Sequence, residues 1–363
     1  MYTSSMDMIK SSILIVDDSA VVRRILSLAI SKHPNFTIAG TAVNGLEGVE
    51  FVKDKKPDLV LLDVEMPIMD GITALKEIRK FNPHIPIIIF SSLTQKGAAT
   101  TIDALTNGAS DYVGKPSNMA DIDMAMQSID QILIPKINSL LQRDVHKTTV
   151  AQFTKSPIPQ AQNSQPQSDP LKKIHAICIG VSTGGPAALN TLFKAWQHPF
   201  SVPIFIVQHM PPKFTDFLAQ RLSEIGVIPV EEPYDGQEAL PGKAYIAPGG
   251  MHMGLKRKGA QVFIEVHDGP LENSCRPSVD VLFRSAATVY GDHLLAVVLT
   301  GMGSDGMLGA TEIRNKQGYV IAQDENSSVV WGMPGSVIKA NLAQKILSLD
   351  SVPGEIELML RTP

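Results

Sequence analysis

Short hydrophobic runs alternate with longer amphipathic stretches through the first 140 or so residues of the chain. After the apolar run at 12–16, for instance, Val22, Ile25, Leu26 and Ala29 recur with the period of an α-helix. Continuous apolar strands between amphipathic helices are typical of a parallel sheet covered by helices on both faces. The pattern predicts strands at 12–16, 37–42, 59–62, 87–90 and 111–113, and helices at 22–29, 46–55, 72–81, 97–107 and from 120 onward.

A second series of the same kind begins at Lys172. We expect a mostly parallel sheet from strands at 174–179, 203–208, 244–247, 294–299 and 319–322, with helices at 214–224, 277–290 and 306–315. Residues 251–256 and 261–266 flank a short turn, which predicts a β-hairpin beside that sheet. The expected fold class is therefore α/β, with two doubly wound, mostly parallel domains.

The segment between the two series changes in character. Residues 117–143 continue as an amphipathic helix, in which Pro135 predicts a kink or a break. Residues 148–169 are rich in Pro, Gln and Ser and nearly lack apolar side chains, so they cannot bury enough surface to order themselves. We therefore expect one domain at 1–143, a linker at 144–171 and a second domain at 172–363.

Composition limits the setting and the partners. Hydrophobic residues make up 44% and charged residues 19% of the chain, as in ordinary globular proteins, and the net charge of −4 gives no general attraction to nucleic acid or anionic membranes. The first ten residues lack the apolar core of a signal peptide, and no apolar run approaches a membrane span of about 20 residues. Cys178 and Cys275 are too few for a disulfide framework. We expect a cytoplasmic monomer that neither binds nucleic acid nor inserts into a membrane.

Polar side chains follow the strands of the first series at the point where each strand ends. Asp17 and Asp18 end the first strand, Asp63 ends the third, Ser91 ends the fourth and Lys115 follows the fifth. The carboxyl ends of parallel strands share one edge of a sheet, so these side chains should meet there. Clustered carboxylates repel one another, and a hard divalent cation, most simply Mg²⁺, removes that conflict, while the lysine would offset charge on a phosphoryl group. Turn formation or helix capping explains one or two such aspartates, but not all five positions together.

In the second series, Ser182 lies between a predicted strand and a predicted helix. Gly180 and Gly184 flank it with the G-x-S-x-G spacing of a nucleophile elbow. The glycines allow a sharp turn, and the start of the helix would direct backbone N–H groups toward an oxyanion. On this motif alone, a turn that merely closes a strand–helix unit or holds a phosphate is equally well supported.

Two further strand ends favour a nucleophilic serine. His209 ends the strand at 203–208, and Asp305 follows the strand at 294–299. An imidazole can accept the proton of a serine hydroxyl, and a carboxylate can orient the imidazole. The loop around Met302 offers a backbone N–H to the oxyanion. Metal catalysis is one alternative, but the sequence contains neither an H-E-x-x-H motif nor paired cysteines. A nucleophilic Cys275 is another, but no glycine elbow surrounds Cys275, and a surface-loop cysteine is the simpler interpretation.

The first series resembles a two-component receiver domain, over about residues 11–140, in the motifs VDDS (16–19), DVEMPIMDG (63–71), SS (91–92) and YVGKP (112–116). The resemblance implies a flavodoxin-like fold and a phosphoryl group that Asp63 accepts from a histidine kinase. It also implies that Asp17 and Asp18 hold Mg²⁺ together with Asp63. Ser91 and Lys115 would contact the phosphate, and Tyr112 would be the switch aromatic.

The second series is similar to the chemotaxis protein-glutamate methylesterase family in the motifs IGVSTGGP (179–186), QHMPP (208–212), APGGMH (247–252), RPSVD (276–280) and LTGMGSDG (299–306). The resemblance implies Ser182 as nucleophile, His209 as general base and Asp305 as the orienting acid. It further implies Thr183 beside the histidine and the Met302 amide in the oxyanion hole. One position departs from the pattern, since Cys275 stands where a histidine or a similar polar residue is expected.

Together these observations predict a phosphorylation-activated hydrolase that removes methyl groups from glutamyl methyl esters of chemoreceptors and also deamidates receptor glutamines. Mg²⁺ would serve receiver phosphorylation, and ester hydrolysis would need no cofactor. The expected partners are methylated chemoreceptor helices and a sensor histidine kinase of the chemotaxis type. The alternatives are a receiver fused to a non-catalytic module that binds protein or DNA, and a transferase or amidase with the same triad.

Overall fold

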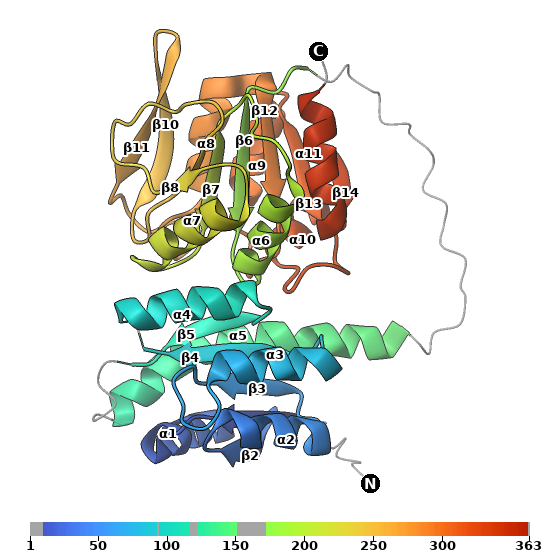
Figure 1. Ribbon diagram of the computed structural model, residues 1–363. Helices are drawn as coiled ribbons and strands as arrows, with labels where there is room; N and C mark the ends of the chain where they lie inside the picture. Colours follow the sequence, from blue (N-terminus) through green and yellow to red (C-terminus); the bar gives the residue numbers. More distant parts are fainter. Residues whose placement is uncertain (1–9, 93, 117–121, 151–171, 362–363) are drawn as a thin grey trace. The chain divides into compact units, whose positions relative to one another are not determined.

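Two separate parallel sheets organise the chain (Figure 1). The computed structural model describes residues 10–92, 94–116, 122–150 and 172–361. The chain divides into two units, Met1–Leu141 and Gln142–Pro363. Each sheet belongs to one of these units, so each unit has its own core and its own set of strand ends.

The first unit is a five-stranded parallel sheet in the order β2-β1-β3-β4-β5. Its strands are β1 (Ser11–Val16), β2 (Phe36–Ala42), β3 (Leu59–Leu62), β4 (Ile87–Ser91) and β5 (Asp111–Gly114), and its helices are α1 (Ala20–Ser31), α2 (Gly45–Lys55), α3 (Gly71–Phe81), α4 (Gln95–Thr106) and α5 (Ile122–Val150). The predicted βα alternation is confirmed. Helices α1 to α4 each begin after a polar residue whose side chain accepts a backbone N–H of the first turn: Ser19, Asn44, Asp70 and Thr94.

The long helix α5 differs from the expectation at two points. It continues through Pro135 without the break that we considered, because Leu133, Ile134 and Ile137 around the proline are buried and hold the helix in the core. It also extends to Val150, so residues 144–150, which we assigned to the linker, are helical. These residues contain neither proline nor glycine to end the helix. The rest of the expected linker, 151–171, lies outside the described residues.

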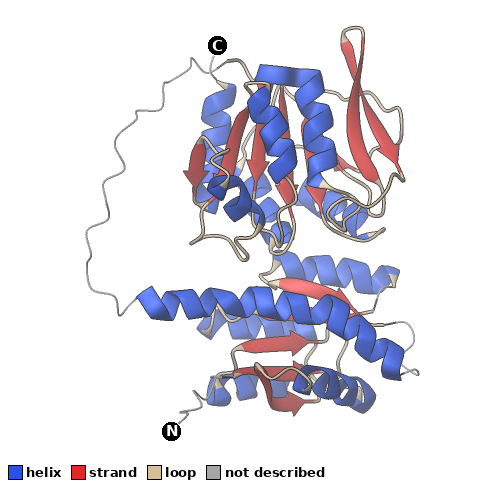
Figure 2. Cartoon of the chain, turned by 180° about the vertical axis from the view of Figure 1, so that it is seen from behind, coloured by secondary structure: helices blue, strands red, loops and turns tan. Residues whose placement is uncertain are grey.

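The second unit is a seven-stranded parallel sheet in the order β14-β13-β12-β6-β7-β9-β8. A separate antiparallel hairpin, β10–β11, packs against α8, and its register is that of a two-residue turn at Gly259 and Ala260 (Figure 2). The strands are β6 (Ala176–Val181), β7 (Ile204–Gln208), β8 (Val230–Glu231), β9 (Ala244–Ile246), β10 (His252–Lys258), β11 (Gln261–His267), β12 (Leu294–Val298), β13 (Tyr319–Gln323) and β14 (Lys345–Leu347). The helices are α6 (Gly185–Ala195), α7 (Phe214–Ile225), α8 (Val279–Tyr290), α9 (Met307–Asn315), α10 (Met333–Lys339) and α11 (Val352–Leu360), with short 3₁₀ turns at Gly291–His293 and Leu349–Ser351.

Alternate side chains of β6 face the two helical layers of the second unit. Ala176 and Cys178 belong to a core cluster with Leu282 and Phe283 of α8, and α9 and α10 lie on the same side of the sheet. Helices α6, α7 and α11 form the other layer (Figures 1 and 2). The expected doubly wound α/β class is therefore confirmed for this unit as well. The sequence pattern missed β8, β14, α10 and α11, which are all short, and the two helices also contain Pro and Gly.

Both sheets reverse their winding direction beside their first strand. In the first unit the chain leaves β1 toward β2 and later returns to the other side of β1 with β3. In the second unit it leaves β6 toward β7 and later returns to the other side of β6 with β12. Ligands of open α/β sheets bind at the carboxyl ends of the strands beside such a reversal. The topology therefore favours ligand sites at the residues that follow β1 and β3, and at those that follow β6 and β12.

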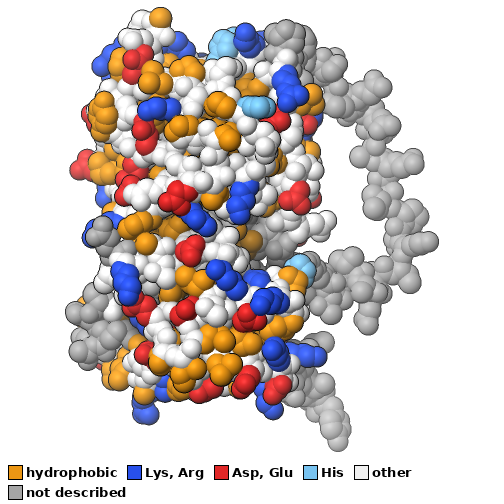
Figure 3. Space-filling model, viewed as in Figure 1, with side chains coloured by type: hydrophobic (Ala, Val, Ile, Leu, Met, Phe, Trp, Pro, Cys, Tyr) orange, Lys and Arg blue, Asp and Glu red, His pale blue; other side chains and the backbone are white. Residues whose placement is uncertain are grey.

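The surface carries charges of both signs. On the face seen in Figure 3, basic and acidic side chains lie interspersed over both units. Such a mixture differs from the clustered Lys and Arg of a nucleic-acid-binding face. Among the helices that the structure describes, none combines the length and the apolar character needed to cross a bilayer.

Candidate active site

The first site lies at the carboxyl ends of β1 and β3. One carboxylate oxygen from each of Asp17, Asp18 and Asp63 lies within 4.8 Å of the others. Lys115, which follows β5, places its Nζ 2.7 Å from Asp63 Oδ2 and 2.9 Å from Asp17 Oδ2. The other oxygen of Asp63 accepts the Val64 N–H at 2.7 Å. The structure thus brings together the acidic residues and the lysine that the sequence predicted for this edge.

These charges depend on one another. Burial raises the pKa of Asp63, and the hydrogen bond from Lys115 offsets this only in part. For Lys115, burial alone would lower the pKa, but the hydrogen bonds to Asp63 and Asp17 outweigh it and leave the pKa raised. Three closely spaced carboxylates fit a hard divalent cation with oxygen ligands, so Asp17, Asp18 and Asp63 are suited to hold Mg²⁺.

Ser91 and Tyr112 lie on the adjoining strands β4 and β5. Ser91 ends β4 and is buried, and its backbone oxygen accepts the Lys115 N–H at 2.8 Å. Tyr112 lies on β5, and Lys136 of α5 lies over its ring with Nζ 5.3 Å from the ring centre. Ser91 is thus tied to the lysine of the acidic edge.

The second site begins where β6 ends. Ser182 follows Val181, and Gly184 takes the left-handed conformation (φ 77°) that lets the chain enter α6 at once. A Cβ on Gly185 would lie 1.9 Å from Gln208 Oε1 and 2.7 Å from a methyl group of Val181, so a larger residue there would have to displace these side chains. The Nε2 of Gln208 donates to the backbone oxygens of both Ser182 (3.1 Å) and His209 (3.3 Å). One amide therefore ties together the strand ends that carry the predicted nucleophile and base.

His209 and Asp305 meet directly, with His209 Nε2 2.7 Å from Asp305 Oδ2. Burial alone would lower the pKa of His209, but the hydrogen bonds with Asp305 and Cys275 reverse this and raise it to about 9. Burial would likewise raise the pKa of Asp305, yet its bonds to His209 and to the α8 N-terminus leave it well below the usual range. The pair thus combines an ionised carboxylate with a strongly basic imidazole.

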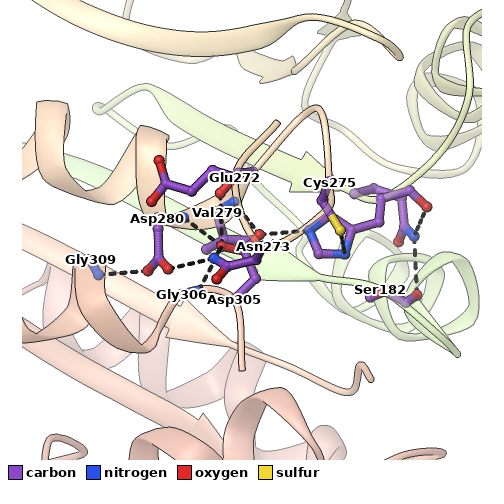
Figure 4. Close-up of polar contacts among 12 residues, drawn as sticks. Ser182, Glu272, Asn273, Cys275, Val279, Asp280, Asp305, Gly306 and Gly309 are labelled. Carbon is purple, nitrogen blue, oxygen red and sulfur yellow. Dashed lines mark hydrogen bonds and ion pairs between the residues drawn. The ribbon is translucent and has the colours of Figure 1, made fainter. Parts of the chain in front are cut away.

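Asp305 is held by a cage of donors at the N-terminus of α8 (Figure 4). Its Oδ1 accepts from Asn273 Nδ2 (2.8 Å), Ser278 Oγ (2.8 Å) and the Asp280 N–H (3.0 Å). Its Oδ2 accepts the Val279 N–H at 2.7 Å as well as the imidazole. Donors on both oxygens and the positive end of the helix dipole stabilise the anion and fix its direction.

The residues before α8 form a tight turn at Glu272–Cys275 that reaches this cage. Asn273 and Ser274 both have positive φ (51° and 61°), and Glu272 and Cys275 exchange backbone hydrogen bonds of 3.1 and 2.9 Å. Asn273 Nδ2 bridges Asp305 and Asp280, each at 2.8 Å. Cys275 lies with Sγ 3.7 Å from His209 Nδ1. Cys275 thus lies half-buried in a turn with the exposed residues Asn273 and Ser274, and it also contacts the imidazole, which the sequence did not predict.

Ser182 lies next to this pair without a hydrogen bond to it. The strands pair Val181 with Gln208, so Ser182 and His209 follow at adjacent strand ends. Among the described residues, no hydrogen bond joins the Ser182 hydroxyl to the imidazole. A Cβ on Gly301 would lie 2.9 Å from the Cβ of Ser182, so the loop that continues into Met302 runs against the serine.

Met302 and Thr183, the residues expected to support the oxyanion and the histidine, are placed mainly by their backbone. Within the described part of the chain, no backbone hydrogen bond engages the Met302 N–H. Thr183 is buried, and its backbone oxygen accepts the Thr300 hydroxyl at 2.8 Å. Sequence reasoning gave no role to Gln208, Asn273 and Ser278, which contact the site residues directly. The only signal for them was their position inside or beside the motifs.

The cage around Asp305 leads to a first prediction. Asn273→Gly keeps the positive φ of the turn but removes the amide that holds Asp305, and we expect it to lower kcat/KM for ester hydrolysis about tenfold, the value of one hydrogen bond. Ser274→Gly is the matched control, because this exposed neighbour has the same backbone conformation and its side chain makes no hydrogen bond to the cage within the described residues. Equal rates for both variants would show that the amide does not orient Asp305.

Comparison with known proteins gives consistent similarities for both units. A family model described as CheB methylesterase matches residues 177–356, and one described as response regulator receiver domain matches residues 13–127. The protein-glutamate methylesterase/protein-glutamine glutaminase of Trichodesmium erythraeum is 47% identical over 348 residues, which cover 96% of this chain and 98% of that protein. The protein of the same name from Nocardioides sp. is 45% identical over 344 residues, covering 95% of this chain and 94% of that protein.

A solved structure matches the second unit. The crystal structure of the Thermotoga maritima CheB methylesterase catalytic domain has 42% sequence identity and a TM-score of 0.50. The match covers 52% of this chain and 100% of that chain. The similarity in sequence and the similarity in fold thus concern the same half of the molecule.

Proposed function

This chain belongs to the protein-glutamate methylesterase/protein-glutamine glutaminase family, and on that premise we propose that it hydrolyses glutamyl methyl esters of chemoreceptors with Ser182, His209 and Asp305. It is a receiver-containing hydrolase, and we assign its activation to phosphorylation of Asp63. The observation that carries the proposal is the 2.7 Å contact between His209 and a caged Asp305, next to the strand end that bears Ser182.

In the acylation step, the Ser182 hydroxyl attacks the γ-carbonyl carbon of the methyl ester. Its proton passes to Nδ1 of His209, because Nε2 already bonds Asp305. The tetrahedral intermediate collapses, the C–O bond to the methoxy group breaks, and the imidazolium returns the proton to the leaving methanol. A glutamyl ester of Ser182 remains.

In the second step, water attacks this acyl-enzyme and gives its proton to His209. The bond to Ser182 Oγ breaks, the serine regains a proton, and a glutamate carboxylate leaves. A glutamine substrate follows the same course with ammonia in place of methanol. Asp305 stays ionised throughout and stabilises the imidazolium.

The oxyanion needs donors close to Ser182. The Met302 amide is suited to this role, since it follows Gly301 against the serine and makes no backbone hydrogen bond within the described residues. Thr183 begins the turn into α6, and the positive dipole end of that helix lies just beyond it. These donors would lower the barrier by stabilising negative charge that develops only in the transition state.

The receiver supplies the switch. Asp63 would accept a phosphoryl group, and Lys115, whose Nζ lies 2.7 Å from Asp63 Oδ2, would pair with it. Asp17, Asp18 and Asp63 would hold Mg²⁺, which would supply the positive charge that screens the phosphoryl oxygens. Ser91, at the end of β4, would contact the phosphate, and Tyr112, within the neighbouring strand β5, would be the switch aromatic. A sensor histidine kinase of the chemotaxis type is the proposed phosphodonor, and methylated receptor helices are the proposed substrates.

The direct test is release of methanol from a methylated receptor peptide by the full chain with Mg²⁺ and a phosphodonor. We expect methanol from the methyl ester and ammonia from the glutamine form. Release of neither product would refute the proposed function, and release of ammonia alone would restrict it to deamidation.

The raised pKa of His209 gives a pH prediction. Only the neutral imidazole accepts the Ser182 proton, so kcat/KM should rise with pH and level off near pH 9, the pKa of about 9 for His209. Below that pH, kcat/KM should fall about tenfold for each unit by which the pH is lowered. Methanol release measured from about pH 6 to 10, after subtraction of hydrolysis without protein, checks this. A flat profile between neutrality and pH 9 would contradict it.

A further inference from the structure

The geometry around His209 points to a role for Cys275. We propose that Cys275 is a positioning residue that holds the Nδ1 side of the His209 imidazole and so sets the pH at which this base can accept the Ser182 proton. The inference rests on the proposed function, because it takes His209 as the general base.

The His209 imidazole has one nitrogen left for catalysis. Nε2 is 2.7 Å from Asp305 Oδ2, so any proton from Ser182 must go to Nδ1. The Sγ of Cys275 lies 3.7 Å from that same nitrogen. Cys275 and the serine hydroxyl therefore lie toward the same ring nitrogen, and among the described residues only Cys275 is within hydrogen-bonding distance of it.

The Cys275 thiol is held in this position by the contacts of its turn. It ends the Glu272–Cys275 turn, whose first residue makes a two-pronged ion pair with Arg284 of α8, at 2.5 and 2.6 Å. The Asn273 side chain fixes the turn to Asp305, and Arg276 Nη1 donates to the backbone oxygens of Asp268 and Gly269 at 2.7 and 2.9 Å. Side chains on both sides of Cys275 are thus anchored to the unit that carries the site.

Charged and titratable groups surround the His209 imidazole. The groups that face the imidazole are Asp305 on Nε2 and Cys275 on Nδ1, and Asp280 and the Glu272–Arg284 pair lie behind Asp305 and the turn. The hydrogen bond and charge of Cys275 act with Asp305 to raise the pKa of His209. Removing the thiol should make the imidazole easier to deprotonate.

The test measures kcat/KM for methanol release against pH in the full-length wild type, Cys275→Ala and Cys275→Ser. We expect the midpoint of the rising limb to fall in both variants, because each removes the sulfur whose interaction with Nδ1 raises the pKa of His209. At pH values below both midpoints, kcat/KM should rise tenfold for each unit by which the midpoint falls. Cys178→Ala is the matched control, since it removes the other thiol from the β6 core, and it should keep the wild-type midpoint.

A second readout needs no turnover. In full-length Ser182→Ala protein labelled with ¹⁵N-histidine, the NMR titration of His209 should shift to lower pH when Cys275→Ala is added. Unchanged midpoints in both the kinetic and the NMR titration would overturn the inference, and so would loss of all activity in Cys275→Ala and Cys275→Ser with intact folding. Full activity in Ser182→Ala alone would instead refute the proposed function, so the two failures are distinguishable.

Discussion

Replacing Ser182 by alanine is expected to lower kcat for methanol release by about 10⁴-fold or more while the protein stays folded. The substitution removes only the attacking oxygen. Because the hydroxyl makes no hydrogen bond within the described contacts, we expect the free energy of unfolding to change by only about 0.5 kcal/mol or less. Methanol release from a methylated receptor peptide and a denaturation curve of the same preparation measure both effects.

The matched control for this variant is Ser304→Ala. Ser304 lies beside Asp305 in the same loop region as Met302, but it is exposed, and its hydroxyl makes no hydrogen bond within the described residues. It should retain wild-type activity. Methanol release by Ser182→Ala at the wild-type rate would remove the serine from the mechanism, whatever the behaviour of His209 and Asp305.

Replacing Asp63 by asparagine is expected to abolish activation by a phosphodonor. Typical coupling between two sites changes a response by about 5- to 150-fold, so wild-type protein should gain a rate increase in that range on phosphorylation. The variant should keep the unphosphorylated rate, because an asparagine side chain at this position cannot accept a phosphoryl group. Methanol release with and without a small-molecule phosphodonor measures the difference.

Two controls separate this effect from a general loss of charge. Asp54→Asn removes one carboxylate from an exposed position of α2 in the same unit and should respond to the phosphodonor like the wild type. Removal of Mg²⁺ by a chelator should suppress activation of the wild type, since Asp17, Asp18 and Asp63 would lose the cation that screens the phosphate. Activation of the Asp63→Asn variant to the wild-type level would exclude Asp63 as the acceptor.

Much of this fold was predictable from local sequence. Apolar strands and amphipathic helices have different periods in the sequence, so their alternation predicted both sheets. The positions of the strand ends predicted that Asp17 lies near Asp63 and that Ser182 lies near His209. The short helices α10 and α11 were not predicted, because each is only two to three turns long and contains a proline and a glycine that hide the helical pattern.

The cage around Asp305 could not be predicted in the same way. Asn273 and Ser278 reach Asp305 across 32 and 27 residues of sequence, and only the packing of α8 brings them there. The Glu272–Cys275 turn has no hydrophobic period, and its two positive φ angles fall on residues other than glycine. That turn directs Cys275 toward the imidazole, so the contact with His209 could not be predicted from the sequence.

The central claim is that Ser182 carries the substrate's acyl group during turnover. Acid quenching of wild-type protein during hydrolysis of a methylated receptor peptide, followed by proteolysis and mass spectrometry, tests it most directly. We expect a glutamyl adduct on the fragment that contains Ser182 and none in the Ser182→Ala variant. An adduct on Cys275, with Ser182 unmodified, would contradict it.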